Sequence, residues 1–400
     1  MVTQGPSLLV LMLALLAAHL AGMGAFLTVP VLAPAIAAET GLPASLAGFH
    51  TALVYGGALL SGPLTGPLVR RHGGVRVLQV GLVAIGCGIA LAAIGQAWAF
   101  ALSAFVAGLG HGPVTPGGSH LIAARTPPRR RALVFSLKQA GVPGGAMMVA
   151  AIAPAIALLG GWRAGVLAMA AVAFLVAIAL QPIRASLDAE RHPRAGGGGL
   201  RAIGKEAAGS LSLLRSDRAL RRLTIMSCGY GVAQFCFLTF FVSYQVAVLG
   251  LPLAEAGIAM AIGQAAGVLG RVAWALMADR MGARIPLVAC GLLAALGGLV
   301  LAAAGPGWPT LVVVLAGMVM GATAVGWNGV MLAEAARIAA PGQVGGTTAA
   351  LSFAFASTML VAPPAFTGLI ALTGGYSAGF LFCVLAVLIG AWAIGTGPRR

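Results

Sequence analysis

The sequence predicts an all-α membrane protein with twelve transmembrane helices in two pseudo-symmetric six-helix bundles. Three observations lead to this prediction. Hydrophobic residues make up 60% of the 400 residues and charged residues only 8%, whereas about 25% of the residues of a soluble domain are charged. The apolar residues form twelve segments, each close to the roughly 20 residues that a helix needs to cross a bilayer. A short basic loop occurs twice, each time between two of these segments.

The twelve segments and their loops use the whole chain and leave no room for a soluble domain of any size. The first of them has no basic residue before it and continues to Val31, so we expect an uncleaved helix rather than a signal peptide. The expected centres of the helices are near Ala18, Leu59, Ile89, Gly110, Val149, Phe174, Phe237, Gly267, Leu296, Met318, Ala356 and Leu385.

The chain divides into two halves around one long polar stretch. Residues 1–183 are the predicted N-terminal bundle, residues 184–222 a cytoplasmic linker with nine basic residues, and residues 223–400 the C-terminal bundle. Similar residues recur at a nearly constant offset, which indicates an internal duplication. The pairs are Arg71 with Arg280 at 209 residues, Trp98 with Trp308 at 210, and Trp162 with Tyr376 at 214.

The net charge of +16 is distributed as in a membrane protein and not as in a nucleic-acid-binding protein. If both termini are cytoplasmic, all of the 24 Lys and Arg residues except Lys138, Arg163 and Arg271 fall in cytoplasmic segments. This asymmetry follows the positive-inside rule. We therefore expect a multi-pass protein with both termini and the linker in the cytoplasm, in contact with lipid and not with nucleic acid.

The two basic loops carry a resemblance to a known family. The first, residues 66–73, reads GPLVRRHG, and the second, residues 275–282, reads ALMADRMG. Both resemble the G-x-L-A-D-R-x-G-R signature of the major facilitator superfamily, and the resemblance extends over essentially the full chain. Four further runs resemble the cyanate-permease-like branch: KQAGVP at 138–143, GGWR at 160–163, Gly270-Arg271, and AEAAR at 333–337.

The resemblance implies a secondary active transporter in the plasma (inner) membrane, which moves a small solute by alternating access. In the family, an acid in the loop helps to hold the cytoplasmic ends of the halves together. Arg70 stands at that position in the first loop, whereas Asp279 keeps the acid in the second. The gate is therefore expected to use Asp279 and Arg280 with the basic cluster Arg129–Arg131. Arg70 and Arg71 in the first loop are the other predicted gating residues.

Two cations lie inside apolar segments, where each costs about 2.5–3.5 kcal/mol and is a candidate for function. Lys138 is about seven residues into the fifth helix, and Arg271 is eight residues before Asp279, or about 12 Å inward. In the family's architecture these helices face each other, so an anion between the cations would relieve their repulsion. The alternatives are that Lys138 snorkels to the cytoplasm and that Arg271 bonds to helix-end carbonyl groups.

Other polar residues in the predicted cavity helices complete the candidate binding site. They are His19, His111, Tyr230, Gln234 and Asn328. For each of them, packing in the helix bundle is the alternative to a contact with substrate. No acid lies mid-membrane, so a histidine could carry a coupled proton, or the substrate could bring its own proton or exchange for a counter-anion.

The sequence gives no sign of an enzyme. It has no P-loop, no nucleophile with a positioned base, and no cysteine or histidine cluster with metal spacing, so we expect neither cofactor nor metal. The expected partners are a small, anionic substrate and the bilayer, and the expected state is a monomer. One alternative is a proton-coupled exporter of drugs or metabolites, and another is a sensor or intramembrane enzyme.

Overall fold

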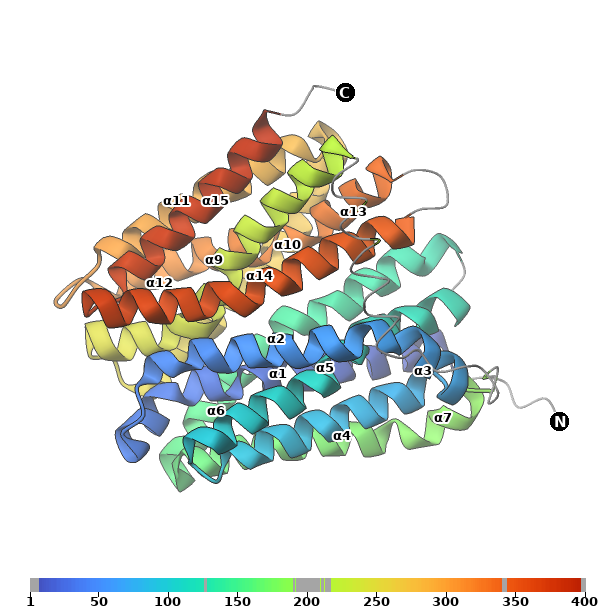
Figure 1. The fold of residues 1–400 in the computed structure, drawn as a ribbon, viewed down its shortest axis with the longest axis horizontal. Coiled ribbons are helices and arrows are strands. Elements are labelled where there is room, and N and C mark those ends of the chain that lie inside the picture. The colour runs from blue at the N-terminus through green and yellow to red at the C-terminus, as the bar shows by residue number, and fades with distance from the viewer. Residues whose placement is uncertain are drawn as a thin grey trace. The chain divides into compact units, whose positions relative to one another are not determined.

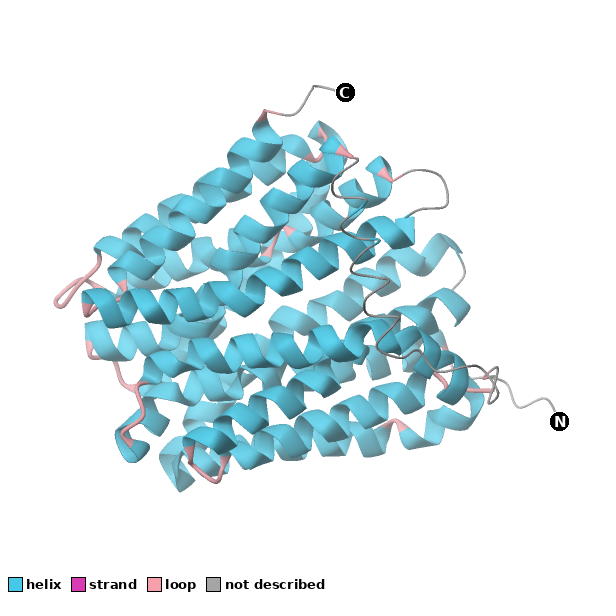
Figure 2. Cartoon of the chain, in the orientation of Figure 1, coloured by secondary structure: helices cyan, strands magenta, loops and turns pink. Residues whose placement is uncertain are grey.

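The computed structural model describes residues 7–125, 128–189, 217–339 and 344–396, together with residues 191, 209 and 212. Most of the predicted linker lies outside these residues, and the side chains of 128–137, with the basic cluster Arg129–Arg131, are not described. Within the described ranges, all regular structure is helical (Figure 2). This confirms the predicted all-α class.

The helices of the N-terminal half are long, and several are joined by short turns (Figure 1). They are α1 (Leu8–Thr40), α2 (Ala47–Ser61), α3 (Thr65–His72), α4 (Gly74–Ala92), α5 (Ala97–Arg125), α6 (Pro128–Ala179) and α7 (Gln181–Leu187), with 3₁₀ turns η1 (Ala44–Leu46) and η2 (Gly62–Leu64).

The C-terminal half follows the same plan. Its helices are α9 (Arg218–Leu249), α10 (Leu253–Met281), α11 (Arg284–Ala303), α12 (Thr310–Met320), α13 (Asn328–Ile338), α14 (Val344–Thr373) and α15 (Ser377–Gly395), and a π-helical turn, η3 (Gly321–Val325), separates α12 from α13.

Eleven helical stretches of the described chain are long and apolar enough to cross a membrane. One of them belongs to α6, whose 52 residues are interrupted at Gly160 and Gly161, where the backbone leaves helical geometry. A continuous helix of that length would extend about 78 Å, more than twice the roughly 30 Å of the hydrocarbon core. Since α6 therefore supplies two crossings, the twelve predicted segments are confirmed.

The chain forms two compact units, Met1–Leu32 with Leu53–Gly204 and Ala33–Ala52 with Lys205–Arg400. In the first unit α4 packs along α5, and in the second α15 packs against α9 and α11. Residues 33–52 join the second unit through side-chain contacts. The Thr51 and Thr239 hydroxyl oxygens are 3.0 Å apart, and the Thr367 hydroxyl donates to the Ser45 carbonyl at 2.6 Å.

Turn glycines repeat between the two halves. Every described residue with a positive φ is a glycine, and these glycines form pairs with similar spacing: Gly41 with Gly250, Gly73 with Gly282, Gly95 with Gly307, and Gly161 with Gly374. The ends of the two basic loops match in detail. Gly73 has φ 92° and donates its N–H to the Val69 carbonyl, and Gly282 has φ 77° and donates to the Ala278 carbonyl. This geometry supports the predicted duplication.

Arg163, the one basic residue expected in an external loop, has a structural role. Its Nε donates to the Ala93 carbonyl at 3.0 Å, just past the end of α4. Its guanidinium carbon lies 4.4 Å from the centre of the Trp162 ring. A cation at the C-terminus of a helix is favourable because it meets the negative end of the helix dipole, so this contact accounts for the position of the arginine.

Candidate functional site

The predicted substrate-binding residues divide between the two units. His19, His111 and Lys138 belong to the first, whereas Tyr230, Gln234, Arg271 and Asn328 belong to the second.

In the first unit, α1, α5 and α6 bring His19 and Lys138 together beside Gly118. A Cβ atom on Gly118 would lie 3.4 Å from His19 Cε1 and 3.5 Å from Lys138 Cδ. Gly141, one turn after Lys138, lets α6 approach α1, since a Cβ there would lie 2.6 Å from the His19 Cβ. Lys138 is only 1% exposed, which does not fit a side chain that snorkels into solvent.

The tautomer of His19 follows from its hydrogen bond. Nδ1 lies 2.9 Å from the Leu15 carbonyl oxygen, which can only accept, so Nδ1 carries the hydrogen. The buried Nε2 has no hydrogen-bond partner among the described residues. A lone pair is therefore available close to Lys138.

His111, on α5, lies against aromatic rings. Its ring stacks on Phe26 with centroids 5.6 Å apart, and Phe26 meets Tyr55 edge-on at 6.0 Å. Its Nδ1 is buried without a hydrogen-bond partner in the described structure. The stacking explains how the ring is held, and a role in binding stays a prediction.

In the second unit, Gln234 on α9 and Asn328 on α13 contact each other. Asn328 Nδ2 donates to Gln234 Oε1 at 3.2 Å. Tyr230 is directed elsewhere, because its hydroxyl donates to the Leu287 carbonyl on α11 at 2.6 Å and its ring meets Trp327 edge-on. This geometry favours packing for Tyr230, while the amide pair stays a candidate for substrate contact.

The structure also reveals a feature that the sequence analysis missed, the break between α12 and α13. Short π turns free backbone carbonyls and are frequent at functional sites. Side chains satisfy the carbonyls here. Trp274 Nε1 donates to Ala322 at 2.8 Å, Trp327 Nε1 to Ala324 at 2.8 Å, and Asn328 Nδ2 to Val325 at 3.3 Å. The glycines at 321 and 326 were the available signal.

Arg271 lies on α10 where this helix meets the break. The preceding residue, Gly270, packs so closely that a Cβ atom would overlap the Ala322 carbonyl, and Trp274 binds the same carbonyl. Gln264, another residue not singled out from the sequence, is fully buried on α10 seven residues before Arg271 and so shares its face. Arg271 is therefore held at the level of the π turn.

The predicted gating residues are exposed at helix ends. Arg70 and Arg71 lie in the last turn of α3, and Asp279 and Arg280 in the last turns of α10. All acids in the described residues lie close to a helix end: Glu39, Asp188, Asp217, Glu255, Asp279 and Glu334. The membrane-embedded part of the described chain thus has no carboxylate at mid-helix.

Two further features lie apart from these residues. Among the described residues, no group of three or more His, Cys, Asp or Glu side chains could hold a metal ion. A cavity of about 520 Å³ at the end of α7 is lined by Gln181, Arg184, Ala185, Asp188, Ala189 and Arg191. None of these belongs to the predicted substrate-binding set.

Comparison with known proteins decides the family. The model of the Major Facilitator Superfamily matches residues 14–363. The chain belongs to this superfamily. Membership confirms the fold class and identifies a member of a transporter family rather than of an enzyme family.

Two sequence relatives agree with this assignment. Two uncharacterised MFS-type transporters of Mycobacterium tuberculosis are 27% identical over 277 residues, which is 69% of this chain and 60% of theirs. The chain thus matches about 60% of the length of these relatives.

The fold also matches solved transporters. A mutant of the nucleoside transporter NupG has a TM-score of 0.77 at 13% identity, with 96% of this chain and 99% of that chain covered. A mutant of the peptide transporter POT in complex with sulfate has a TM-score of 0.76 at 17% identity, with coverage of 96% and 93%. These likenesses concern the fold alone.

Proposed function

We propose that this superfamily member is a secondary active transporter that moves a small anionic solute across the plasma (inner) membrane by alternating access. The observation that carries the proposal is the pair of embedded cations, Lys138 in the first unit and Arg271 in the second. Lys138 is the first residue of one apolar span, Arg271 lies inside another, and no carboxylate lies mid-helix in the described membrane segments. The resemblance of their sequence contexts to the cyanate-permease-like branch supports the same proposal.

The chemistry of the side chains favours an anion. A cation in an apolar segment is stabilised when an opposite charge approaches it. The guanidinium of Arg271 can bind a carboxylate or a similar oxyanion through two parallel hydrogen bonds. In the second unit, Gln234 and Asn328 would add amide groups. In the first unit, Lys138 would attract negative charge and His19 would add an imidazole.

Uptake into vesicles tests this proposal. Purified protein is reconstituted in liposomes, and flux is measured for small carboxylates, small inorganic anions and lipophilic cations. The proposal expects saturable flux of at least one anion. Flux of lipophilic cations alone, driven by a proton gradient, would instead establish the proton-coupled exporter, and no flux of any class would favour the sensor.

If a proton gradient drives solute flux, we expect the coupling between proton and solute to depend on a histidine. Imidazole is the side chain that exchanges protons near neutral pH, and His19 Nε2 offers a free lone pair beside Lys138. His19→Gln should uncouple solute flux from the proton gradient, and His111→Phe, which keeps the stacking on Phe26, should do less. The measurement is solute flux with an imposed pH gradient. Proton-driven flux that persists without both histidines would exclude this route.

The gate is expected to respond unequally to changes in the two loops. Because the second loop keeps Asp279 and the first has Arg70, Asp279→Asn should shift the conformational balance more than Arg70→Ala. Both residues are exposed, so neither change should prevent folding. The measurement is the labelling rate of single cysteines in the cytoplasmic and external halves of the helices. Equal shifts for the two variants would contradict this assignment of the gate.

A further inference from the structure

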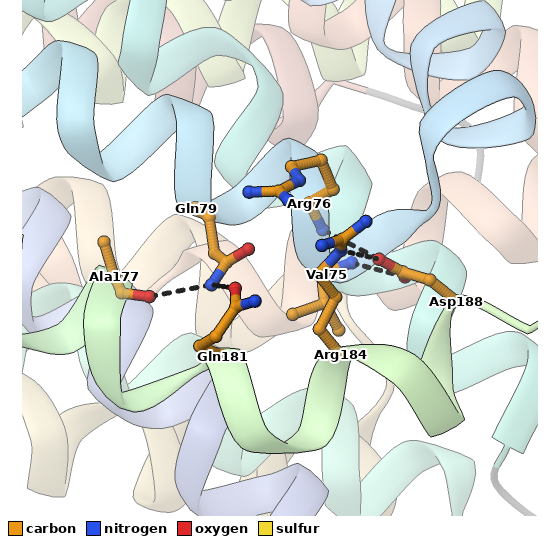
Figure 3. Close-up of polar contacts among 7 residues, drawn as sticks. All are labelled: Val75, Arg76, Gln79, Ala177, Gln181, Arg184 and Asp188. Atoms are coloured by element: carbon orange, nitrogen blue, oxygen red, sulfur yellow. Dashed lines mark hydrogen bonds and ion pairs between the residues drawn. The ribbon is translucent and has the colours of Figure 1, made fainter.

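The start of α4 is capped by an acid from a distant part of the first unit. The first N–H groups of a helix lack partners within the helix. Here Val75 N–H donates to Asp188 Oδ1 at 2.9 Å and Arg76 N–H donates to Asp188 Oδ2 at 3.0 Å (Figure 3). Asp188 follows the last residue of α7, so it does from 113 residues away what an N-cap side chain does locally.

The last glycine of the first basic loop makes this contact possible. Gly73 precedes α4 and has φ 92°, a conformation that side-chain-bearing residues rarely adopt. A Cβ atom on Gly73 would overlap the Asp188 side chain. The position therefore needs glycine for two reasons, the backbone turn and the space taken by the carboxylate.

Neighbouring contacts fix Asp188 in place. Asp188 is only 2% exposed, and Arg184 Nε lies 3.9 Å from the Asp188 Oδ2 atom. One turn further along α4, Gln79 Nε2 donates to the Ala177 carbonyl and to Gln181 Oε1, both at 2.9 Å (Figure 3). The segment from the end of α6 to Asp188 is thus attached to the start of α4 at two successive turns of that helix.

The second repeat is built differently at the corresponding position. Gly282 has a similar φ of 77°, but a Cβ atom there would meet nothing within 4 Å in the described structure. The helix that follows, α11, has Ala283 at its N-cap and no side-chain cap. The acid of the second repeat, Asp279, is exposed near the end of α10.

We propose that Asp188 supplies the acid that the first basic loop itself lacks. It is a positioning residue that braces the α3–α4 turn against the end of α7. In the first repeat the acid thus acts within one unit, and Arg70 stands at the loop position where the second repeat has Asp279. If the protein works by alternating access, as proposed above, the brace makes the loop with Arg70 and Arg71 move together with the helix that leads into the linker.

A double-mutant cycle in thermal unfolding tests the brace and needs no substrate. Gly73→Ala should lower Tm by more than Gly282→Ala, because both introduce backbone strain but only the first displaces a carboxylate. The Asp188→Gly background removes the overlapping side chain. In that background, Gly73→Ala should lower Tm further only by as much as Gly282→Ala does. Equal losses for the two alanines in the otherwise unchanged protein would overturn the proposal, even if no Asp188 variant folds.

Amide hydrogen exchange supplies the readout that a merely structural role would not change. In Asp188→Asn, an NH₂ group faces one of the two N–H donors, so a peptide with Val75 and Arg76 should exchange at least several-fold faster. A peptide that covers the start of α11 is the matched control and should not change. Unchanged exchange at Val75 and Arg76 would overturn the assignment. Because neither readout involves flux, failure of the brace and failure of the transport proposal are distinguishable.

Discussion

Arg271→Ala is expected to weaken binding of the proposed small anionic substrate by roughly 30-fold to several-thousand-fold. Removal of one partner of a buried charged contact costs about 2–5 kcal/mol, and each 1.4 kcal/mol is a factor of ten in affinity. Arg271→Lys keeps the charge but loses the planar fork, so affinity should also fall sharply. Lys138→Arg should be milder, because another cation can replace a point charge.

The measurement is substrate affinity in purified, folded protein, with the anion identified by the vesicle screen. Arg337→Ala is the matched control, since it removes the same charge from an exposed ion pair with Glu334, and such pairs contribute about 0–1 kcal/mol. Affinity close to that of the unchanged protein in Arg271→Ala would assign this arginine to packing against the π turn.

Gly321→Ala is expected to cause the largest loss of stability among substitutions that add one methyl group. A Cβ atom on Gly321 would overlap the Gly263 carbonyl oxygen of α10. Both partners are backbone, so no side chain can rotate away and the helices must separate. Overpacking costs about 1–3 kcal/mol and occasionally more, and here it would also disturb the carbonyl groups bound by Trp274 and Asn328.

Gly329→Ala provides the comparison within the same crossing. Gly329 is exposed near the start of α13, and a Cβ atom there would meet nothing within 4 Å. Alanine at an unstrained glycine position usually stabilises by about 0.4–1 kcal/mol. Thermal unfolding in detergent should therefore show a lower Tm for Gly321→Ala and an unchanged or higher Tm for Gly329→Ala. Similar Tm values for the two variants would contradict close packing between Gly321 and Gly263.

The fold could be predicted because the bilayer requires long apolar helices, and composition reports this requirement directly. The duplication was also visible, because the loops at 66–73 and 275–282 need the same backbone turn and keep the same glycine. Lys138 and Arg271 were conspicuous because charges are rare in such a sequence. These features depend on single residues or on local runs of sequence.

The missed features depend on contacts between distant segments. Asp188 reads as part of a polar linker, and nothing in its neighbourhood shows that it caps a helix 113 residues earlier. The break between α12 and α13 lies in a run that is apolar throughout, where hydrophobicity cannot distinguish a π turn from a regular helix. Tyr230 and Gln234 share a helical face in the sequence, yet the Tyr230 hydroxyl is directed to Leu287.

The paired turn glycines also bear on how the two halves could diverge after a duplication. On a lipid-facing side of a helix, one apolar residue can replace another at little cost, so similarity between halves is soon erased there. A turn with positive φ strongly favours glycine, so an exchange there introduces backbone strain. If the halves arose by duplication, a shared pattern is therefore expected to persist longest at the bends, as at Gly41 with Gly250 and Gly73 with Gly282.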